Sequence, residues 1–332
     1  MSERDELTEV SPELRAPLNE ETPRHALRQL ITPVESRFAR SHFPVPEVVP
    51  EQLDIGGAVG EPMRISLGQL RQLPSVTLTV TTECAGNHRA VIEPKVAGEP
   101  WTGGAISTSQ WTGVPLERLL AWTGVKEAAV DVSFHAADAG YARSLPLAKA
   151  MERDTLVAWE MNGAPIPRRY GGPIRLVVPA WYGMASVKWL IRIEVLERPF
   201  EGEFQTDKYQ YAPGVPVTVM RVKSTFLDPQ DGATLRKGKN RIRGLAWGGE
   251  GGVVQVEVAI GGQWQNARIL GPLLPHAWRR FELDWDAKAA GSFTLRCRAR
   301  DAAGNLQPEQ AEWNPAGYGA NPVERIQVRV SG

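Results

Sequence analysis

The residues most able to do chemistry lie in one short segment, residues 82–89, which reads Thr-Glu-Cys-Ala-Gly-Asn-His-Arg. A strand-like run leads into it, because apolar side chains and threonines alternate over residues 76–81. Cys84 would therefore stand at the end of a strand, before two small residues and three polar ones. A free cysteine often only packs in a core, but a thiol in such a loop is placed to meet a ligand. We interpret Cys84 as a functional residue.

Further motifs follow this segment or precede it. They are Arg-Ser-His-Phe-Pro-Val-Pro at 40–46, Gly-Ala-Ile-Ser at 104–107, Glu-Met-Asn-Gly at 160–163, Gly-Gly-Pro-Ile-Arg-Leu-Val-Val-Pro at 171–179, Ser-Val-Lys-Trp-Leu at 186–190 and Trp-Asn at 313–314. Together with the cysteine segment they resemble the sulfite oxidase family of molybdenum enzymes, over roughly residues 25–330. Ser41 departs from that pattern, since the family has Asn there.

The resemblance implies a molybdenum cofactor, in which a pyranopterin with a terminal phosphate carries the metal. It makes Cys84 the protein ligand of the metal, and only a thiolate can ligate. It places Arg175 and Lys188 on the anionic part of the cofactor, where a guanidinium fork and an ammonium suit phosphate. The implied cofactor contacts are Phe38, Ala39, Arg40, Ser41, His42, Cys84, Asp138, Tyr170, Arg175, Ser186, Val187 and Lys188. Tyr170 stands where the animal enzymes carry His.

The resemblance also implies a substrate pocket on the open side of the metal. Arg40 would hold a small oxyanion or oxo substrate there. Trp159 stands before Glu-Met-Asn-Gly, at a position where we expect the family's tyrosine beside the reactive centre, so we predict Trp159 to be a catalytic-pocket residue that makes sulfite a poor substrate. Arg279 and Arg280 are both candidates for a second substrate arginine, and the sequence does not choose between them.

The activity that the resemblance implies is oxygen-atom transfer by a molybdopterin-dependent oxidoreductase, either sulfite oxidation or reaction of a related small oxo substrate. Electrons would pass to a separate acceptor, because the chain has no Cys-x-x-Cys-His haem motif and we expect no haem or flavin in it. A sulfoxide or N-oxide reductase and a non-catalytic cofactor-binding homologue are alternatives. A thiol hydrolase using Cys84 and His88 is another, although such pairs usually lie far apart in sequence.

Composition limits the function classes. The 332 residues carry 38 basic and 38 acidic side chains, and neither a basic patch nor a motif indicates nucleic-acid binding. We expect no membrane span, because no stretch approaches 18 apolar residues. The first residues have no features of a signal peptide, so we expect a cytoplasmic protein.

The elements that must position these residues fall into three predicted regions. Residues 1–35 are a polar N-terminal arm. Residues 36–212 form the molybdopterin-binding domain, with a mixed α+β pattern and a helix over 115–122. Residues 213–332 show alternating runs, among them Val254 to Ile260 and Phe293 to Cys297, that predict an all-β sandwich. The resemblance makes this second domain immunoglobulin-like and implies that it holds a homodimer.

Overall fold

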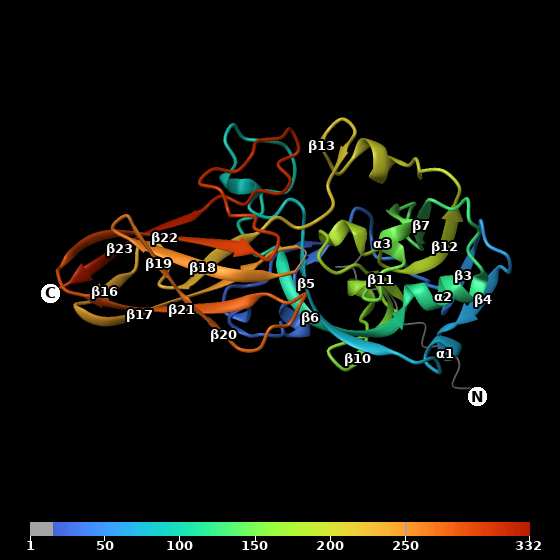
Figure 1. Cartoon of the computed structure of the whole chain (residues 1–332), viewed down its shortest axis with the longest axis horizontal. Helices are drawn as coiled ribbons and strands as arrows, with labels where there is room; N and C mark the ends of the chain where they lie inside the picture. Colours follow the sequence, from blue (N-terminus) through green and yellow to red (C-terminus); the bar gives the residue numbers. More distant parts are fainter. Residues whose placement is uncertain (1–15, 250) are drawn as a thin grey trace.

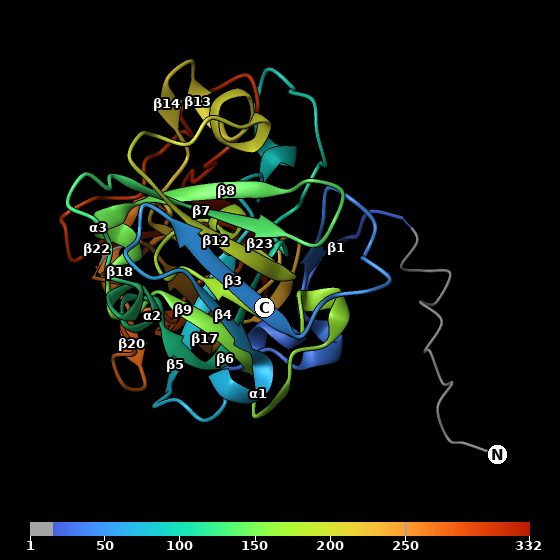
Figure 2. The same cartoon turned by 90° about the vertical axis from the view of Figure 1, so that its right-hand side faces the viewer.

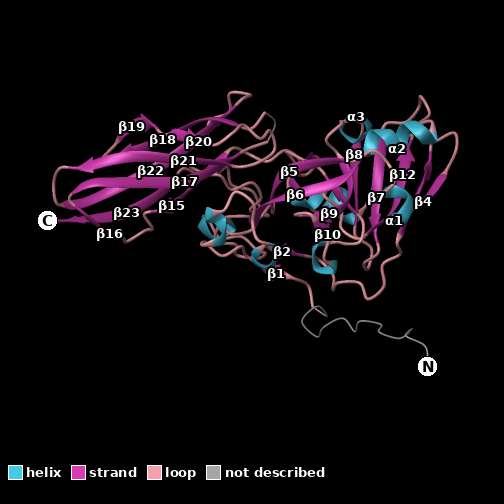
Figure 3. Cartoon of the chain, turned by 90° about the horizontal axis from the view of Figure 1, so that it is seen from below, coloured by secondary structure: helices cyan, strands magenta, loops and turns pink. Residues whose placement is uncertain are grey.

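The computed structural model describes residues 16–249 and 251–332, and this part of the chain is mostly β-strand with a few short α-helices (Figures 1 and 3). Two lobes are visible in Figure 1, an N-terminal one at the right and an elongated C-terminal one at the left. The predicted N-terminal arm falls partly outside the described residues. The N-terminal lobe is richer in strand than the predicted mixed α+β pattern suggested, because its helices span four to eight residues each.

One sheet of the N-terminal lobe has the strand order β4-β3-β12-β7-β8. Its strands are β3 (Gln52–Gly57), β4 (Met63–Ser66), β7 (Asp131–Ala136), β8 (Ala142–Pro146) and β12 (Leu190–Leu196). Strand β12 pairs parallel with β3 and antiparallel with β7. It therefore forms the central strand of the sheet, although it follows the other four strands in the sequence. Figure 2 faces this lobe and shows β8, β7, β12 and β3 as neighbouring ribbons.

The other sheet has the order β10-β9-β6-β5, and β11 also pairs with β9. Its strands are β5 (Val76–Glu83), β6 (Ile106–Pro115), β9 (Leu156–Met161), β10 (Ala164–Pro165) and β11 (Arg175–Val177). The predicted strand before Cys84 is confirmed as β5, which pairs antiparallel with β6 from Val76 to Glu83. Cys84 therefore follows directly on a strand that eight paired residues hold in register.

Three α-helices accompany these sheets in the described part of the chain: α1 (Leu67–Leu70), α2 (Leu116–Thr123) and α3 (Leu147–Ala150). The helix predicted over 115–122 is confirmed as α2. It buries Leu116, Leu119 and Leu120 completely, which is the face that the apolar spacing predicts. It ends at Gly124, whose positive φ of 65° allows the left-handed cap.

The C-terminal lobe contains a sheet of order β15-β17-β21-β20 and a sheet of order β16-β23-β22-β18-β19. Their bounds are β15 (Lys223–Asp228), β16 (Thr234–Arg236), β17 (Gly238–Trp247), β18 (Val253–Ile260), β19 (Gln263–Asn266), β20 (Arg268–Leu270), β21 (Arg279–Ala287), β22 (Gly291–Asp301) and β23 (Glu324–Ser331). Side chains of both sheets share one core, and Leu295 and Cys297 lie in it as the alternation predicts. Val254 is exposed instead, because a register shift between Val253 and Gln255 moves it to the outer face.

Short strands near the lobe junction complete the fold. Strand β1 (Asn19–Glu20) pairs with β2 (Ala39–Arg40), so part of the predicted arm is tied to the segment that carries Arg40. Strands β13 (Gln210–Ala212) and β14 (Val215–Pro216) form a small hairpin between the lobes. None of the helices in the described residues is both long and apolar enough to cross a bilayer.

Candidate functional site

Cys84 sits in a tight loop at the end of β5. Its N–H donates to the carbonyl of Ala105, at 2.9 Å, and its own carbonyl accepts the N–H of Asn87, also at 2.9 Å. A methyl group on Gly86 would lie 2.4–2.6 Å from the guanidinium of Arg89, so glycine there leaves room for that arginine. The thiol is half-buried, and burial raises its pKa above the usual value. A loop fixed in this way presents the sulfur in a defined position.

A chain of hydrogen bonds runs from Arg40 on β2 to a tyrosine at the lobe junction. The Nη2 of Arg40 lies 3.3 Å from Nδ1 of His42, and Nε2 of His42 lies 2.7 Å from the hydroxyl of Tyr209. Burial, together with the nearby positive charge of Arg40, lowers the pKa of His42 to about 3, so the ring is neutral at neutral pH. Since arginine can only donate, Nδ1 is the acceptor and Nε2 carries the proton that it donates to Tyr209.

Arg175, Lys188 and Arg37 form a cationic wall beside this chain. The guanidinium of Arg175 donates to the backbone oxygens of Tyr170 at 2.6 Å, of Ser186 at 3.0 Å and of Leu176 at 3.3 Å. Lys188 Nζ donates to the carbonyl of Arg40 at 2.8 Å.

The ion pairs found among the described residues include none of Arg37, Arg40, Arg175 or Lys188. Burial and then the charge of Arg37 hold the pKa of Arg175 well below its usual value. Burial and then the charges of Arg175 and Arg37 do the same for the pKa of Lys188. Burial and mutual repulsion both destabilise these positive charges, and no carboxylate of the described residues pairs with them. A bound anion would relieve this cost, so the arrangement is typical of an anion-binding site.

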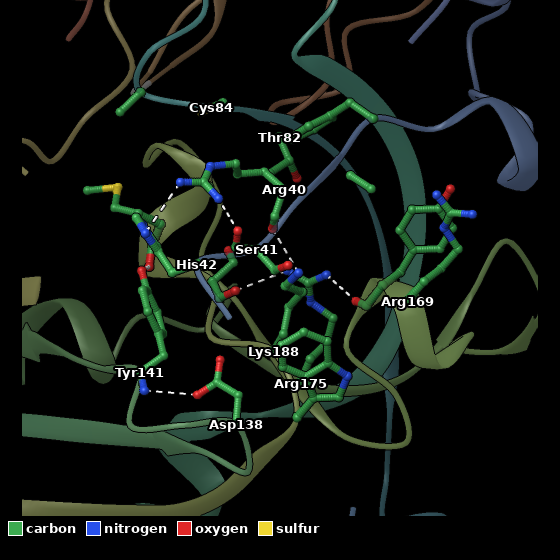
Figure 4. A pocket seen from close by; sticks show the side chains of 18 of the residues that line it. Arg40, Ser41, His42, Thr82, Cys84, Asp138, Tyr141, Arg169, Arg175 and Lys188 are labelled. Atoms are coloured by element: carbon green, nitrogen blue, oxygen red, sulfur yellow. Dashed lines mark hydrogen bonds between the residues drawn. The ribbon is translucent and has the colours of Figure 1, made fainter. Parts of the chain in front are cut away.

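Asp138 closes the opposite end of the site. In Figure 4 it lies at the bottom of the view and Cys84 at the top, with Arg40, Lys188 and Arg175 between them. Its carboxylate accepts the N–H of Tyr141 at 2.9 Å. Burial raises the pKa of Asp138, although the N–H groups of Tyr141 and Gly140 oppose this shift. A carboxylate has further lone pairs that can accept from the N–H groups of a bound heterocycle.

Two cavities meet at Cys84. The first is lined by Arg37, Phe38, Ala39, Arg40, Ser41, His42, Thr82, Cys84, Ala85, Asp138, Tyr141, Arg169, Tyr170, Arg175, Gly183, Met184, Ser186, Lys188, Trp189 and Tyr209. The second is lined by Arg40, His42, Cys84, Arg89, Ala97, Gly98, Glu99, Trp101, Asp207, Lys208, Tyr209, Gln210, Pro315, Ala316 and Tyr318. They share Arg40, His42, Cys84 and Tyr209. The thiol can therefore face one ligand in the first cavity and another in the second.

Of the twelve cofactor contacts predicted from the sequence, eleven line the first cavity together. They are Phe38, Ala39, Arg40, Ser41, His42, Cys84, Asp138, Tyr170, Arg175, Ser186 and Lys188. Val187 does not line it, because its side chain is fully buried in the main core of the N-terminal lobe. Its neighbours Ser186 and Lys188 turn into the cavity instead.

Trp159 was predicted in the substrate pocket, and the structure places it elsewhere. Along β9, Val157 and Trp159 pack into the main core, whereas Ala158 packs into the cluster that contains the cavity residues Tyr170 and Trp189. Successive side chains of a strand point to opposite faces, so the indole lies on the face away from that cluster. Trp159 is a core residue, 3% exposed, and the predicted loss of a phenol from the pocket is wrong.

Tyr209 supplies the phenol that the sequence interpretation missed. It lies only a few residues before the predicted domain boundary at 212–213, yet its side chain is buried and lines both cavities. Its φ of 56° is unusual for a tyrosine. Tyr318 from the C-terminal lobe stacks on it, with ring centroids 5.2 Å apart. The only signal in the sequence was a cluster of aromatic residues around the predicted boundary.

The second cavity also contains a cation that we had not assigned. Arg89 is 8% exposed, and its guanidinium donates to the carbonyls of Ala316 and Glu99 at 2.9 and 2.8 Å. Arg279 and Arg280, the predicted candidates, lie on β21 and line neither cavity. The C-terminal lobe thus contributes Tyr318 to the site rather than either arginine. His88 lines neither cavity, so the geometry does not bring the base of the hydrolase alternative to Cys84.

Comparisons with known proteins agree with this site. A family model described as an oxidoreductase molybdopterin binding domain matches residues 42–204, and one described as a Mo-co oxidoreductase dimerisation domain matches residues 215–331. Mitochondrial sulfite oxidase of Rattus norvegicus is 35% identical over 95% of this chain and 64% of its own length. Sulfite oxidase of Arabidopsis thaliana is 31% identical over 95% of this chain and 93% of its own length.

Among solved structures, the sulfane dehydrogenase SoxCD of Paracoccus pantotrophus superposes with a TM-score of 0.85 at 33% identity, covering 96% of this chain and 86% of that one. The chain spans just under two thirds, 64–65%, of the mammalian mitochondrial relatives.

Proposed function

Because the chain belongs to the sulfite oxidase family of molybdopterin-dependent oxidoreductases, we propose that it catalyses oxygen-atom transfer at a molybdenum pyranopterin held beside Cys84. The substrate is sulfite or a related small sulfur oxyanion, and the electrons pass to a separate acceptor. One observation carries the proposal: the cavity at the thiol is lined by five cationic side chains and a single carboxylate. Such a cavity has the charge to hold an anionic cofactor.

The residues fit this cofactor. Lys188 and Arg175 supply an ammonium and a guanidinium for a phosphate, and Asp138 supplies an acceptor at the far end of the cavity. Within the described residues no three His, Cys, Asp or Glu side chains converge, and Cys84 is the thiol that reaches the cavity. When bound, the cofactor would supply two-electron redox chemistry coupled to oxygen-atom transfer.

The protein's own groups would bind and orient the substrate. Arg40 lines both cavities, so its guanidinium can hold an oxyanion on the open side of Cys84. Arg89 adds a second positive charge to the outer cavity. Because His42 donates to the oxygen of Tyr209, the phenolic proton is left free to donate to a substrate oxygen. These donors would stabilise negative charge as the substrate reacts.

From Trp159 we predicted that sulfite is a poor substrate. The site supports the opposite proposal, that sulfite or a similar anion is turned over well. That prediction rested on a lost phenol, and Tyr209 provides one in the pocket. The opposite direction, reduction of a sulfoxide or N-oxide, uses the same cofactor, and a non-catalytic homologue would bind it without turnover. Since the similar protein SoxCD is a sulfane dehydrogenase, sulfane sulfur belongs among the substrates to test.

We propose further that the chain divides into an arm over 1–35, a catalytic domain over 36–212 and an immunoglobulin-like domain over 213–332. The match of residues 215–331 to a dimerisation domain supports a homodimer through the last of these. The protein would act in the cytoplasm. Light scattering at micromolar concentration should give the mass of two chains, and a monomer would contradict this part of the proposal.

The decisive experiment measures molybdenum per chain and then turnover. About one molybdenum per chain is expected, followed by oxidation of sulfite with an artificial acceptor. A panel of sulfite, a sulfane-sulfur compound, a sulfoxide and an N-oxide, assayed in both redox directions, identifies the reaction. Protein that takes up no molybdenum from a cofactor-replete host would overturn the proposal, and protein that is loaded but inert would favour the non-catalytic homologue.

A further inference from the structure

A buried ion pair joins the two lobes directly behind Cys84. Lys223, the first residue of β15, places its Nζ 2.6 Å from Oε1 of Glu83, and the two side chains are 2% and 0% exposed. Trp247, the register partner of Lys223 on β17, donates its Nε1–H to Oε2 of Glu83 at 2.9 Å. Two adjacent positions of the C-terminal lobe thus aim their donors at one carboxylate.

The same carboxylate is tied to the loop that carries the thiol. Asn87 Nδ2 donates to Oε1 of Glu83 at 3.0 Å, while Oδ1 of Asn87 accepts the N–H of Ala105 at 3.1 Å. Ala105 also accepts the N–H of Cys84. Glu83, Asn87 and Ala105 therefore form a closed set of contacts around the backbone of Cys84.

Backbone contacts from the C-terminal lobe reinforce this arrangement on both sides of the thiol. The N–H of Gly319 donates to the carbonyl of Ala85 at 2.8 Å, and the N–H of Thr81 donates to the carbonyl of His276 at 2.8 Å. The C-terminal lobe consequently contacts the chain at Thr81, at Glu83 and at Ala85, on both sides of Cys84.

We propose that Lys223 and Trp247 are positioning residues, through which the C-terminal domain fixes the Cys84 loop by way of the Glu83 carboxylate. A buried carboxylate that loses its cationic partner is strongly destabilised and draws toward water. Because Glu83 is the residue next to Cys84, any such movement displaces the sulfur. This domain thereby acts on the metal ligand, in addition to any role in assembly.

The meaning of this inference for catalysis rests on the proposed role of Cys84, but its test does not. Lys223→Met removes the charge and keeps most of the length of the side chain, and the double variant Glu83→Gln with Lys223→Met removes both charges. Ile242→Ala is the matched control, because Ile242 is fully buried on the same strand as Trp247 but belongs to the core of the C-terminal lobe. Amide hydrogen exchange of residues 78–90 is followed in cofactor-free protein.

Lys223→Met should speed exchange of the Cys84 and Asn87 amides about tenfold or more. The double variant should bring the rate back toward that of the wild type, and Ile242→Ala should leave the loop's rate unchanged. Rates within twofold of the wild type in Lys223→Met, no rescue in the double variant, or equal acceleration by Ile242→Ala would each overturn the proposal.

In protein loaded with molybdenum, Lys223→Met should also shift the electron paramagnetic resonance spectrum of Mo(V), whereas Ile242→Ala should not. A shift in both variants, or in neither, would count against a positioning role. If no molybdenum is bound at all, the proposed function fails while the exchange result still decides this inference.

Discussion

Replacing Lys188 by Met should change protein stability and cofactor binding in opposite directions. In the cofactor-free protein the substitution removes one hydrogen bond, from Nζ to the carbonyl of Arg40, and a contact of Nζ with the Trp189 ring at 4.4 Å. Each is worth about 1 kcal/mol. Against this loss, it relieves the burial of an ammonium and its repulsion by Arg175 and Arg37, which together hold the pKa of Lys188 well below its usual value.

Replacing poorly compensated buried charge by an apolar side chain of similar size is often neutral or stabilising. We therefore expect the free energy of unfolding to stay constant or to rise by about 1–2 kcal/mol. Cofactor binding should weaken, because a charge-assisted hydrogen bond to a phosphate contributes about 1.5–3 kcal/mol, or roughly 10- to 150-fold in affinity.

Urea unfolding of cofactor-free protein measures the first effect, and molybdenum and pterin content measure the second. Lys126→Met, at an exposed position, controls for the loss of a charge as such and should change neither. Full occupancy in Lys188→Met together with a loss of more than about 2 kcal/mol of stability would refute the reasoning and make Lys188 a structural residue.

Three further substitutions test the site. Cys84→Ser should abolish turnover and leave the fold intact, and retained turnover at normal molybdenum content would contradict its role as ligand. Tyr209→Phe should lower kcat/KM for sulfite about 10- to 100-fold with unchanged molybdenum content, since it removes the donor held by His42; an unchanged kcat/KM would exclude the phenol. Trp159→Tyr should lower the free energy of unfolding by about 1–3 kcal/mol, because it leaves a gap and a buried hydroxyl in the core. A rise in kcat/KM for sulfite at equal metal loading would contradict the placement of Trp159 in the core.

The sequence predicted the composition of the cofactor cavity better than its geometry. The family motifs identify residues such as Cys84 and Arg175 directly, and most of the residues identified in this way line one cavity. Side-chain direction was less accessible, because it depends on strand register. Val187 lies between two residues that line the cavity, and Trp159 follows Ala158, which packs in the cluster of Tyr170 and Trp189, yet Val187 and Trp159 both turn into the main core.

Residues contributed by the junction and by the other lobe could not be predicted from local patterns. Tyr318 reaches the site only because the two lobes pack together, and its stacking on Tyr209 joins positions more than 100 residues apart. Arg89 lay within the cysteine segment, but its role depends on the carbonyl of Ala316 in the C-terminal lobe. The β-bulge that exposes Val254 similarly leaves no mark in an alternating sequence.

The placement of Glu83 explains how the cavity keeps its positive charge. Its side chain is fully buried one residue before Cys84, close enough to neutralise a cation of the cavity if it pointed there. Adjacent residues at a strand end point to opposite sides, so Glu83 faces the C-terminal lobe while Cys84 faces the cavity. Lys223, Trp247 and Asn87 already satisfy the carboxylate. The cations around the thiol therefore remain available to an anion, and the energy that their burial costs is recovered only when that anion binds.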